Sequence, residues 1–205
     1  ASDRWYGNLR LVLYAVPQAA ESEAAQPLAA AFGDVVGLQG YTLHTPHPTS
    51  GDVVQLTLYW QALRPVERRL KVFIHLVDGR GHIVGQHDSE PGGGKSLTTS
   101  WAVGEKIEDN YGIAIPAGAP PGEHTLRLGL YGLEDGARLP LTAGGGDLSD
   151  ALDTARVWVQ RAPTPPVVAS LDMDLADDRT WGALRLLGHS LYPLGRRHEA
   201  AWQLR

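Results

Sequence analysis

Residues 53–61 read VVQLTLYWQ, a stretch in which every second side chain from Val54 to Trp60 is apolar. Alternate side chains of an extended chain point to opposite faces, so this pattern predicts a strand with one buried face. Residues 70–76, LKVFIHL, repeat the alternation. The sequence DGRG at 78–81 then offers the positive φ angles that a hairpin turn needs, so a third strand is expected over residues 82–87.

Further alternations lie at residues 36–43, 107–115, 126–130 and 155–160, separated by segments rich in glycine and proline. Residues 134–136, EDG, are expected to turn the chain into a short segment at 137–141. Seven or eight short strands at this spacing, with no convincing long helix, predict an all-β fold. We expect an antiparallel two-sheet sandwich of the immunoglobulin or fibronectin type III kind, with an up-and-down barrel as the alternative.

The same patterns suggest a domain order. Residues 1–17 are expected to be the closing strand of a preceding domain, 18–31 a linker, 32–161 the sandwich, and 162–170 a proline-rich linker. The sequence WGALRLLGHSL at 181–191 resembles FGDVVGLQGYTL at 32–43, so residues 171–205 are interpreted as the start of a second, truncated sandwich repeat. We therefore expect this sequence to be an excerpt of a longer polypeptide.

The amino-acid composition narrows the classes of function that the chain can have. The formal charge is −5, from 18 Lys and Arg against 23 Asp and Glu, which gives no electrostatic reason to expect nucleic acid or an anionic membrane as a partner. The absence of cysteine excludes disulfides, thiolate metal sites and a cysteine nucleophile. No apolar run reaches the length of about 20 residues needed to span a bilayer. No cofactor is expected.

The histidines and carboxylates give no convincing site. With Gly79 and Arg80 at the centre of the turn, His75 and His82 share a face while His87 lies on the other, so no metal site is predicted. The same register places Lys71 opposite Asp88 as an ion pair. The neighbouring carboxylates at 105, 108 and 109 suggest glycoside hydrolysis, but acid and base must flank a cleft, so solvated side chains are the preferred interpretation and no catalytic residue is assigned.

Aromatic residues make the more informative set. Tyr59, Phe73, Tyr131 and Trp158 fall on the phase opposite the aliphatic residues of their strands, and Trp101 follows a glycine-rich loop. The apolar face of a pyranose can cover an aromatic ring while its hydroxyls reach polar neighbours, so these five residues are candidate glycan-binding residues. The preferred alternative is that the rings cover the second sheet, the linker or an adjoining domain.

Several short sequences together resemble a known kind of domain. They are FGD at 32–34, LTLYWQA at 56–62, VFIHLVD at 72–78, GQHD at 85–88 and GLY at 129–131. Residues 32–160 resemble the accessory immunoglobulin-like sandwich that follows the membrane region of bacterial (Chloroflexota-type) dolichyl-phosphate-mannose-type glycosyltransferases. In such proteins the unit often occurs in tandem.

The resemblance implies an extracytoplasmic module of the cell envelope that serves as a spacer or interaction domain. Its partners would be neighbouring domains of the same polypeptide, with a glycan as a further candidate, and it would meet the membrane only through an upstream region. The catalytic carboxylate of that family lies in a loop between membrane helices, which nothing in this chain matches, so the resemblance implies no enzymatic activity for this piece. An independent carbohydrate-binding module and a cryptic hydrolase remain the rival hypotheses.

Overall fold

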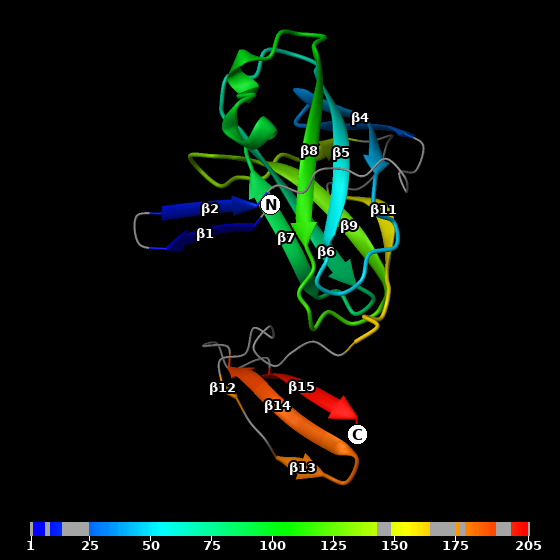
Figure 1. The fold of residues 1–205 in the computed structure, drawn as a ribbon. Helices are drawn as coiled ribbons and strands as arrows, with labels where there is room; N and C mark the ends of the chain where they lie inside the picture. Colours follow the sequence, from blue (N-terminus) through cyan, green and yellow to red (C-terminus); the bar gives the residue numbers. More distant parts are fainter. Residues whose placement is uncertain are drawn as a thin grey trace.

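The computed structural model describes residues 2–6, 9–13, 25–142, 149–164, 175–176, 179–191 and 198–204. Within these ranges the regular structure is almost entirely β-strand, and no α-helix is present. Two antiparallel sheets pack face to face (Figure 1), which confirms the predicted all-β sandwich. The first has the order β10-β3-β4-β5-β8 and the second has the order β11-β9-β6-β7.

The strands of the five-stranded sheet are β3 (Gln26–Phe32), β4 (Val36–Leu43), β5 (Val53–Ala62), β8 (Lys106–Ala114) and β10 (Leu141–Thr142). Those of the four-stranded sheet are β6 (Leu70–Asp78), β7 (Ile83–Ser89), β9 (Gly122–Gly132) and β11 (Leu152–Val159).

The core lies between the two sheets and is built by the alternation that the sequence shows. On β5 the even-numbered side chains, among them Leu58 and Trp60, are buried, and on β6 Ile74 and Leu76 face them. Trp60 packs edge-on against Phe32, with ring centroids 6.0 Å apart. Burying one such side chain stabilises the fold by roughly 1.5–3 kcal/mol. Because alternate side chains of a strand point to opposite faces, burial of the apolar phase leaves the polar phase facing outward.

Contacts cover the edges of the sandwich formed by β7 and β8 and by β11. At one edge β7 meets β8: Gly85 lies so close to the Ala114 carbonyl that a Cβ would come within 2.5 Å of its oxygen, and His87 Nδ1 is 3.0 Å from the Gly112 oxygen. At the other edge, the segment at 46–49 lies along β11, and the backbone N–H of Trp158 donates to the Pro46 carbonyl at 2.9 Å. These contacts leave few strand edges open to pairing with other chains.

The connection from β7 to β8 contains two short 3₁₀ turns, η1 (Pro91–Gly94) and η2 (Thr98–Ser100). The hydroxyl of Thr98 is fully buried, where it accepts from Leu70 N–H and donates to the Arg68 carbonyl, both at 3.0 Å. Arg69 and Glu90 form a bidentate pair that joins the same connection to β6. The start of β6 is thus fixed by side chains of this connection.

Residues 18–31 were expected to be a linker, but their second half belongs to the sheet. Gln26–Phe32 forms β3 and pairs with β4. The strand was not predicted because proline is rare in strands. β10 pairs only with residues 31 and 32 of β3, so Pro27 lies at an open edge, where its missing N–H costs no sheet hydrogen bond.

The hairpin between β6 and β7 also differs from prediction. A bulge between Leu76 and Val77 shifts the register, so Phe73 rather than Lys71 lies opposite Asp88, and Lys71 pairs with Tyr131 on β9. The predicted Lys71–Asp88 ion pair is therefore wrong. The loop after Asp78 is also one residue wider than a two-residue turn, with Asp78 N–H donating to the His82 carbonyl, so the loop and the bulge each move the register by one residue.

Separate short sheets precede and follow the sandwich. β1 (Ser2–Tyr6) and β2 (Leu9–Leu13) form a hairpin where a single strand was expected. Near the other end, β12 (Leu175–Ala176), β13 (Thr180–Trp181), β14 (Leu184–Leu191) and β15 (His198–Leu204) form one sheet. The expected proline-rich linker at 162–170 is described only as far as residue 164.

The sheet β13-β14-β15 has the same pairing pattern as β3-β4-β5. Gly182 and Gly33 each have a positive φ, of 58° and 57°, at equivalent hairpin turns. Leu186 pairs with Trp202 just before a bulge in β14, as Leu38 pairs with Trp60 just before a bulge in β4. The sequence echo thus has a structural counterpart in these strands, while the completed second repeat stays a prediction.

Candidate functional site

The outer face of the four-stranded sheet carries an open hollow of about 220 Å³. It is lined by residues from three separate stretches of the chain: Phe73, His75, Asp88, Tyr131, Gly136 and Arg138. Two of them, Phe73 and Tyr131, are among the five predicted aromatic residues. The hollow therefore combines aromatic rings with a carboxylate, a guanidinium and an imidazole.

The register of β6 and β9 positions the rings. Phe73 lies opposite Gly129 on β9, and its ring crosses the space that a side chain at Gly129 would fill, since a Cβ there would come within 2.5 Å of ring carbons. The Tyr131 ring centroid is 6.3 Å from that of Phe73, and that of His75 is 5.0 Å away. A glycine opposite an aromatic residue is a common way to seat a ring on a sheet.

Arg138 reaches the hollow through the turn that follows β9. Gly136, at φ 66°, allows the chain to reverse, and Arg138 then forms a β-bridge with Tyr131. Its guanidinium carbon lies 4.3 Å from the centroid of the Phe73 ring, and Nη1 is 3.2 Å from the carboxylate of Asp150. Held between a ring and a carboxylate, Arg138 presents its remaining N–H groups in a fixed direction.

The surroundings of His75 and Tyr131 shift the pKa of both side chains. Burial lowers the pKa of His75, and Arg138 and Arg127 act in the same direction while Asp88 opposes them. The imidazole is consequently neutral near pH 7 and can both donate and accept. Burial and the neighbouring Asp88 raise the pKa of Tyr131, so its hydroxyl keeps its proton and donates to Asp88 at 3.2 Å.

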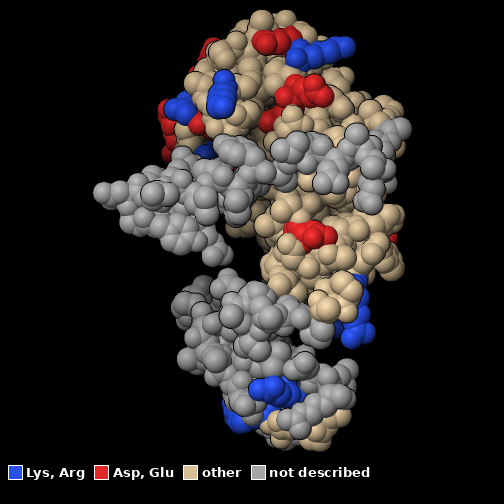
Figure 2. Space-filling model, in the orientation of Figure 1, with Lys and Arg blue, Asp and Glu red and all other residues tan. Residues whose placement is uncertain are grey.

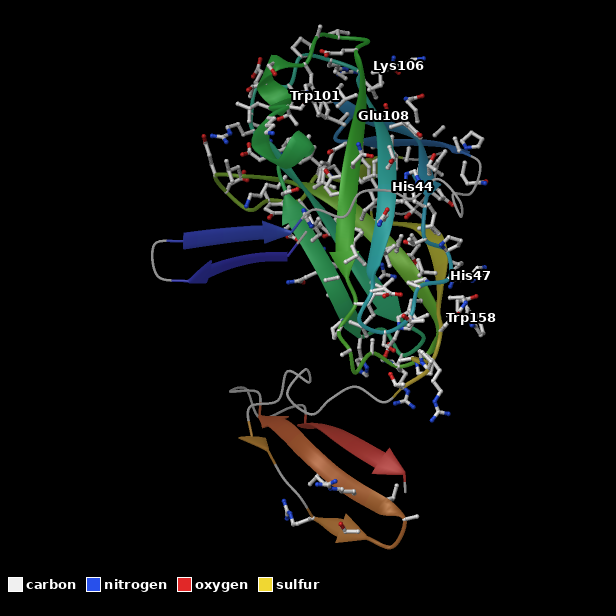
Figure 3. The ribbon with its side chains drawn as sticks, viewed as in Figure 1. His44, His47, Trp101, Lys106, Glu108 and Trp158 are labelled. Atoms are coloured by element: carbon white, nitrogen blue, oxygen red, sulfur yellow. The ribbon has the colours of Figure 1, made fainter. Side chains whose placement is uncertain are left out.

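Further along the same face, charged side chains are paired across β9 and β11. Arg127 binds Asp153 through two hydrogen bonds of 2.7 and 3.1 Å. Arg156 contacts Glu123 at 3.0 Å. Directly opposite Glu123 lies Trp158, which is 54% exposed and projects outward from β11 (Figure 3).

The five predicted glycan-binding residues do not form one face. Tyr59 lies on the outer face of the five-stranded sheet, on the far side of the sandwich from Tyr131, and its hydroxyl is 2.9 Å from that of Thr42. Trp101 is only 6% exposed and belongs to the core beside the 3₁₀ turns (Figure 3). The predicted residues Tyr59 and Tyr131 therefore cannot belong to one glycan-binding surface, because consecutive strands β5 and β6 belong to different sheets.

Phe73, Tyr131 and Trp158 do share the outer face of the four-stranded sheet, but their accessibility differs. Phe73 is 2% exposed and forms the floor of the hollow under Arg138, so it supports rather than offers a stacking surface. Tyr131 is half-buried at the wall, and Trp158 is open. Of these three rings, those of Tyr131 and Trp158 are accessible to a ligand.

Three residues of the hollow were missed from the sequence. His75 shares the phase of Phe73 and could have been found by that alternation. Asp88 was assigned to the wrong partner because the bulge is invisible in the sequence. Arg138 enters through a turn and a single β-bridge, for which only the EDG turn at 134–136 gave a signal.

The carboxylates at 108 and 109 lie on opposite faces of β8, so they do not converge as an acid and base pair. Glu108 pairs across the outer face with Tyr59, whereas Asp109 is 1% exposed between the sheets. Asp109 accepts hydrogen bonds from Tyr111 Oη–H and Gly92 N–H, and burial raises its pKa although both bonds oppose this. This enclosed cluster links η1 to the core.

Three general features of the described residues bear on function. Among them, no three His, Asp or Glu side chains gather as a group able to hold a metal ion. On the upper part of the face shown in Figure 2, the described basic and acidic side chains lie interspersed rather than in a patch of one sign. No helix within the described ranges has both the length and the apolar character needed to cross a bilayer.

No protein-family model and no curated protein matches the sequence. Among solved structures, the chain is similar to one described as the crystal structure of the C-terminal domain of wzt, with a TM-score of 0.42 and 9% sequence identity. The match covers 68% of this chain and 83% of the other. A likeness at this distance carries no information on ligand or activity.

Proposed function

We propose that the sandwich is a non-catalytic carbohydrate-binding module, with the hollow at Tyr131 holding a sugar unit. The observation that carries this proposal is the meeting of an aromatic wall with Asp88, His75 and Arg138 in one small open hollow. Sugars are recognised by this combination, because C–H faces pack on rings while hydroxyls need both donors and acceptors.

The polar groups supply both kinds of partner. Asp88 is exposed and accepts, Arg138 donates, and the neutral imidazole of His75 does either. Arg138 is already oriented by Phe73 and Asp150, so little side-chain freedom would be lost when a ligand binds. The hollow has room for one sugar ring.

The test is a glycan array followed by titration calorimetry with the whole chain. Tyr131→Ala should abolish binding, whereas Tyr59→Ala is the matched control: it removes an equally half-buried tyrosine from the opposite sheet. Asp88→Asn should weaken binding and leave the melting temperature nearly unchanged, since Asp88 is exposed. Unchanged binding by Tyr131→Ala, or no ligand on the array, would refute the proposal.

A second function is supported by the sheets that flank the sandwich. Because β1-β2 precedes it and β12-β15 follows it, we propose that it also serves as a spacer between domains. The resemblance of residues 32–160 to accessory sandwiches of glycosyltransferases is the ground for proposing that the parent protein is an extracytoplasmic, membrane-anchored protein of that kind. Protease accessibility of this region in intact cells, compared with lysed cells, tests the location. Protection in intact cells that is lost on lysis would contradict it.

A further inference from the structure

The outer face of the four-stranded sheet continues from the hollow to a second aromatic residue. Tyr131 and Glu123 are eight residues apart on β9 and point to the same face, and Trp158 lies opposite Glu123. At roughly 3.3 Å per residue, the two rings are separated by about 26 Å along the strand. One sugar ring in the hollow cannot reach Trp158.

The side chains between the two rings are polar but electrically balanced. Arg127 is paired with Asp153 and Arg156 with Glu123, and Arg156 also donates to the hydroxyl of Thr125 at 2.9 Å. Each positive charge has a negative partner within hydrogen-bond distance, so this strip does not favour a ligand of either sign. Its oxygens and N–H groups remain accessible at the surface.

From this arrangement we propose that the ligand is a linear, uncharged polysaccharide that lies along β9, with one unit in the hollow and another on Trp158. The proposal rests on the proposed function and extends its site. Trp158 provides an open indole for stacking, and the paired charges between the rings provide hydrogen bonds to hydroxyls along the chain.

The strip fits a protein partner less well. The centres of protein interfaces are depleted in charged residues, whereas the centre of this face is occupied by the two ion pairs of Arg127 and Arg156. A glycan chain has no such requirement, because its own hydroxyls can replace the water that solvates these groups.

Calorimetry with a ladder of neutral linear oligosaccharides, from the monosaccharide to the octasaccharide of the strongest array ligand, tests the inference. Affinity should rise with length until the chain reaches Trp158. Trp158→Ala should then lower the affinity of the longest oligosaccharide by about 3- to 10-fold, the equivalent of one aromatic contact, and leave that of the monosaccharide unchanged. Val103→Ala removes a similarly exposed apolar side chain from a loop outside this face and should have no effect.

The outcomes separate the two proposals. If the monosaccharide and octasaccharide bind equally and Trp158→Ala changes neither, the extended site is refuted while the hollow stands as a sugar site. If an acidic polysaccharide binds more tightly than its neutral counterpart, the uncharged ligand class is refuted. If no sugar binds, the proposed function fails and the extended site with it.

Discussion

Gly129→Ala should disturb the hollow and the fold together, because one added methyl group meets the floor of the site. A Cβ at this position would lie 2.5 Å from Cε1 and Cζ of Phe73 and 2.6 Å from the carbonyl oxygen of Asp150. Carbon atoms pack best about 3.5–4.0 Å apart, so the Phe73 ring must retreat by about 1 Å. Arg138 and Tyr131 limit that movement on the outer side.

The magnitude follows from two opposing effects. Overpacking of this kind costs about 1–3 kcal/mol, while replacing glycine with alanine restricts the unfolded chain and returns roughly 0.4–1 kcal/mol. The free energy of unfolding should fall by about 1–2 kcal/mol. For a chain of 205 residues this lowers the melting temperature by roughly 2–8 °C.

Urea denaturation of a double-mutant cycle with Phe73→Leu provides the assay. Leucine lacks the two ring carbons nearest to Gly129, so the double variant should be more stable than the sum of the single effects by about 1 kcal/mol. Rescue should be incomplete, because the clash with the Asp150 carbonyl persists. Gly79→Ala, whose Cβ would meet nothing within 4 Å, is the control. Wild-type stability of Gly129→Ala, or strict additivity in the cycle, would refute this reasoning.

Three further sets of variants test buried and partly buried groups. Thr98→Val should lower the free energy of unfolding by roughly 2 kcal/mol in urea, because it leaves two buried backbone groups without partners, while Thr98→Ser should cost far less. Burial raises the pKa of Asp109 above its ordinary 3.8, against the hydrogen bond from Tyr111, so the folded protein retains a proton that the unfolded chain releases. Stability should therefore fall as pH rises from 3.8 through the folded pKa, and Asp109→Asn should flatten this slope; an unchanged slope would exclude Asp109 as its source. Burial lowers the pKa of both His75 and His87 below 6.5, so their contribution is full above pH 6.5 and is lost as pH falls through the folded values. As pH falls over that range, the denaturation midpoint of the His75→Gln/His87→Gln variant should decrease less than that of the wild type.

Most strands of the sandwich could be predicted because each carries its own signal, whereas β3, which contains Pro27, could not. In β5 and β6, the side chains on the apolar phase, such as Leu58 and Ile74, are the buried ones. Burial of one face is a local property of a strand, so a period of two is sufficient to find it. The assignment of Tyr59 and Tyr131 to outward phases was correct for the same reason.

The site could not be assembled from the same signals. Which outward residues share a face depends on how strands are divided between the sheets, and β5 and β6 pass to opposite sheets across one loop. The position of Asp88 depends on a bulge, which shifts the register without altering the alternation on either side. Trp101, expected as a glycan-binding candidate beside a glycine-rich loop, instead donates its indole N–H to Ser96 and packs in the core.

The two outward tyrosines show why one face suits a ligand better than the other. Around Tyr59 the polar side chains bind one another: its hydroxyl contacts Thr42, and Thr57 donates to Asn110, while both threonines are buried. Hydrogen-bonding capacity spent within the sheet is not available to a ligand.

Around Tyr131 the arrangement differs, because Asp88 and Arg138 are exposed and each keeps oxygens or N–H groups beyond those used in its contacts with the protein. A carboxylate has about four acceptor positions and a guanidinium has five N–H donors, so one internal bond leaves most of their capacity for hydroxyl groups. Tyr59→Phe should therefore change stability and not glycan binding, whereas Tyr131→Phe should weaken glycan binding by releasing Asp88 from its present orientation. Melting temperatures and calorimetric affinities of this pair separate the two faces, and equal effects of both variants on affinity would show that the hollow is not the binding site.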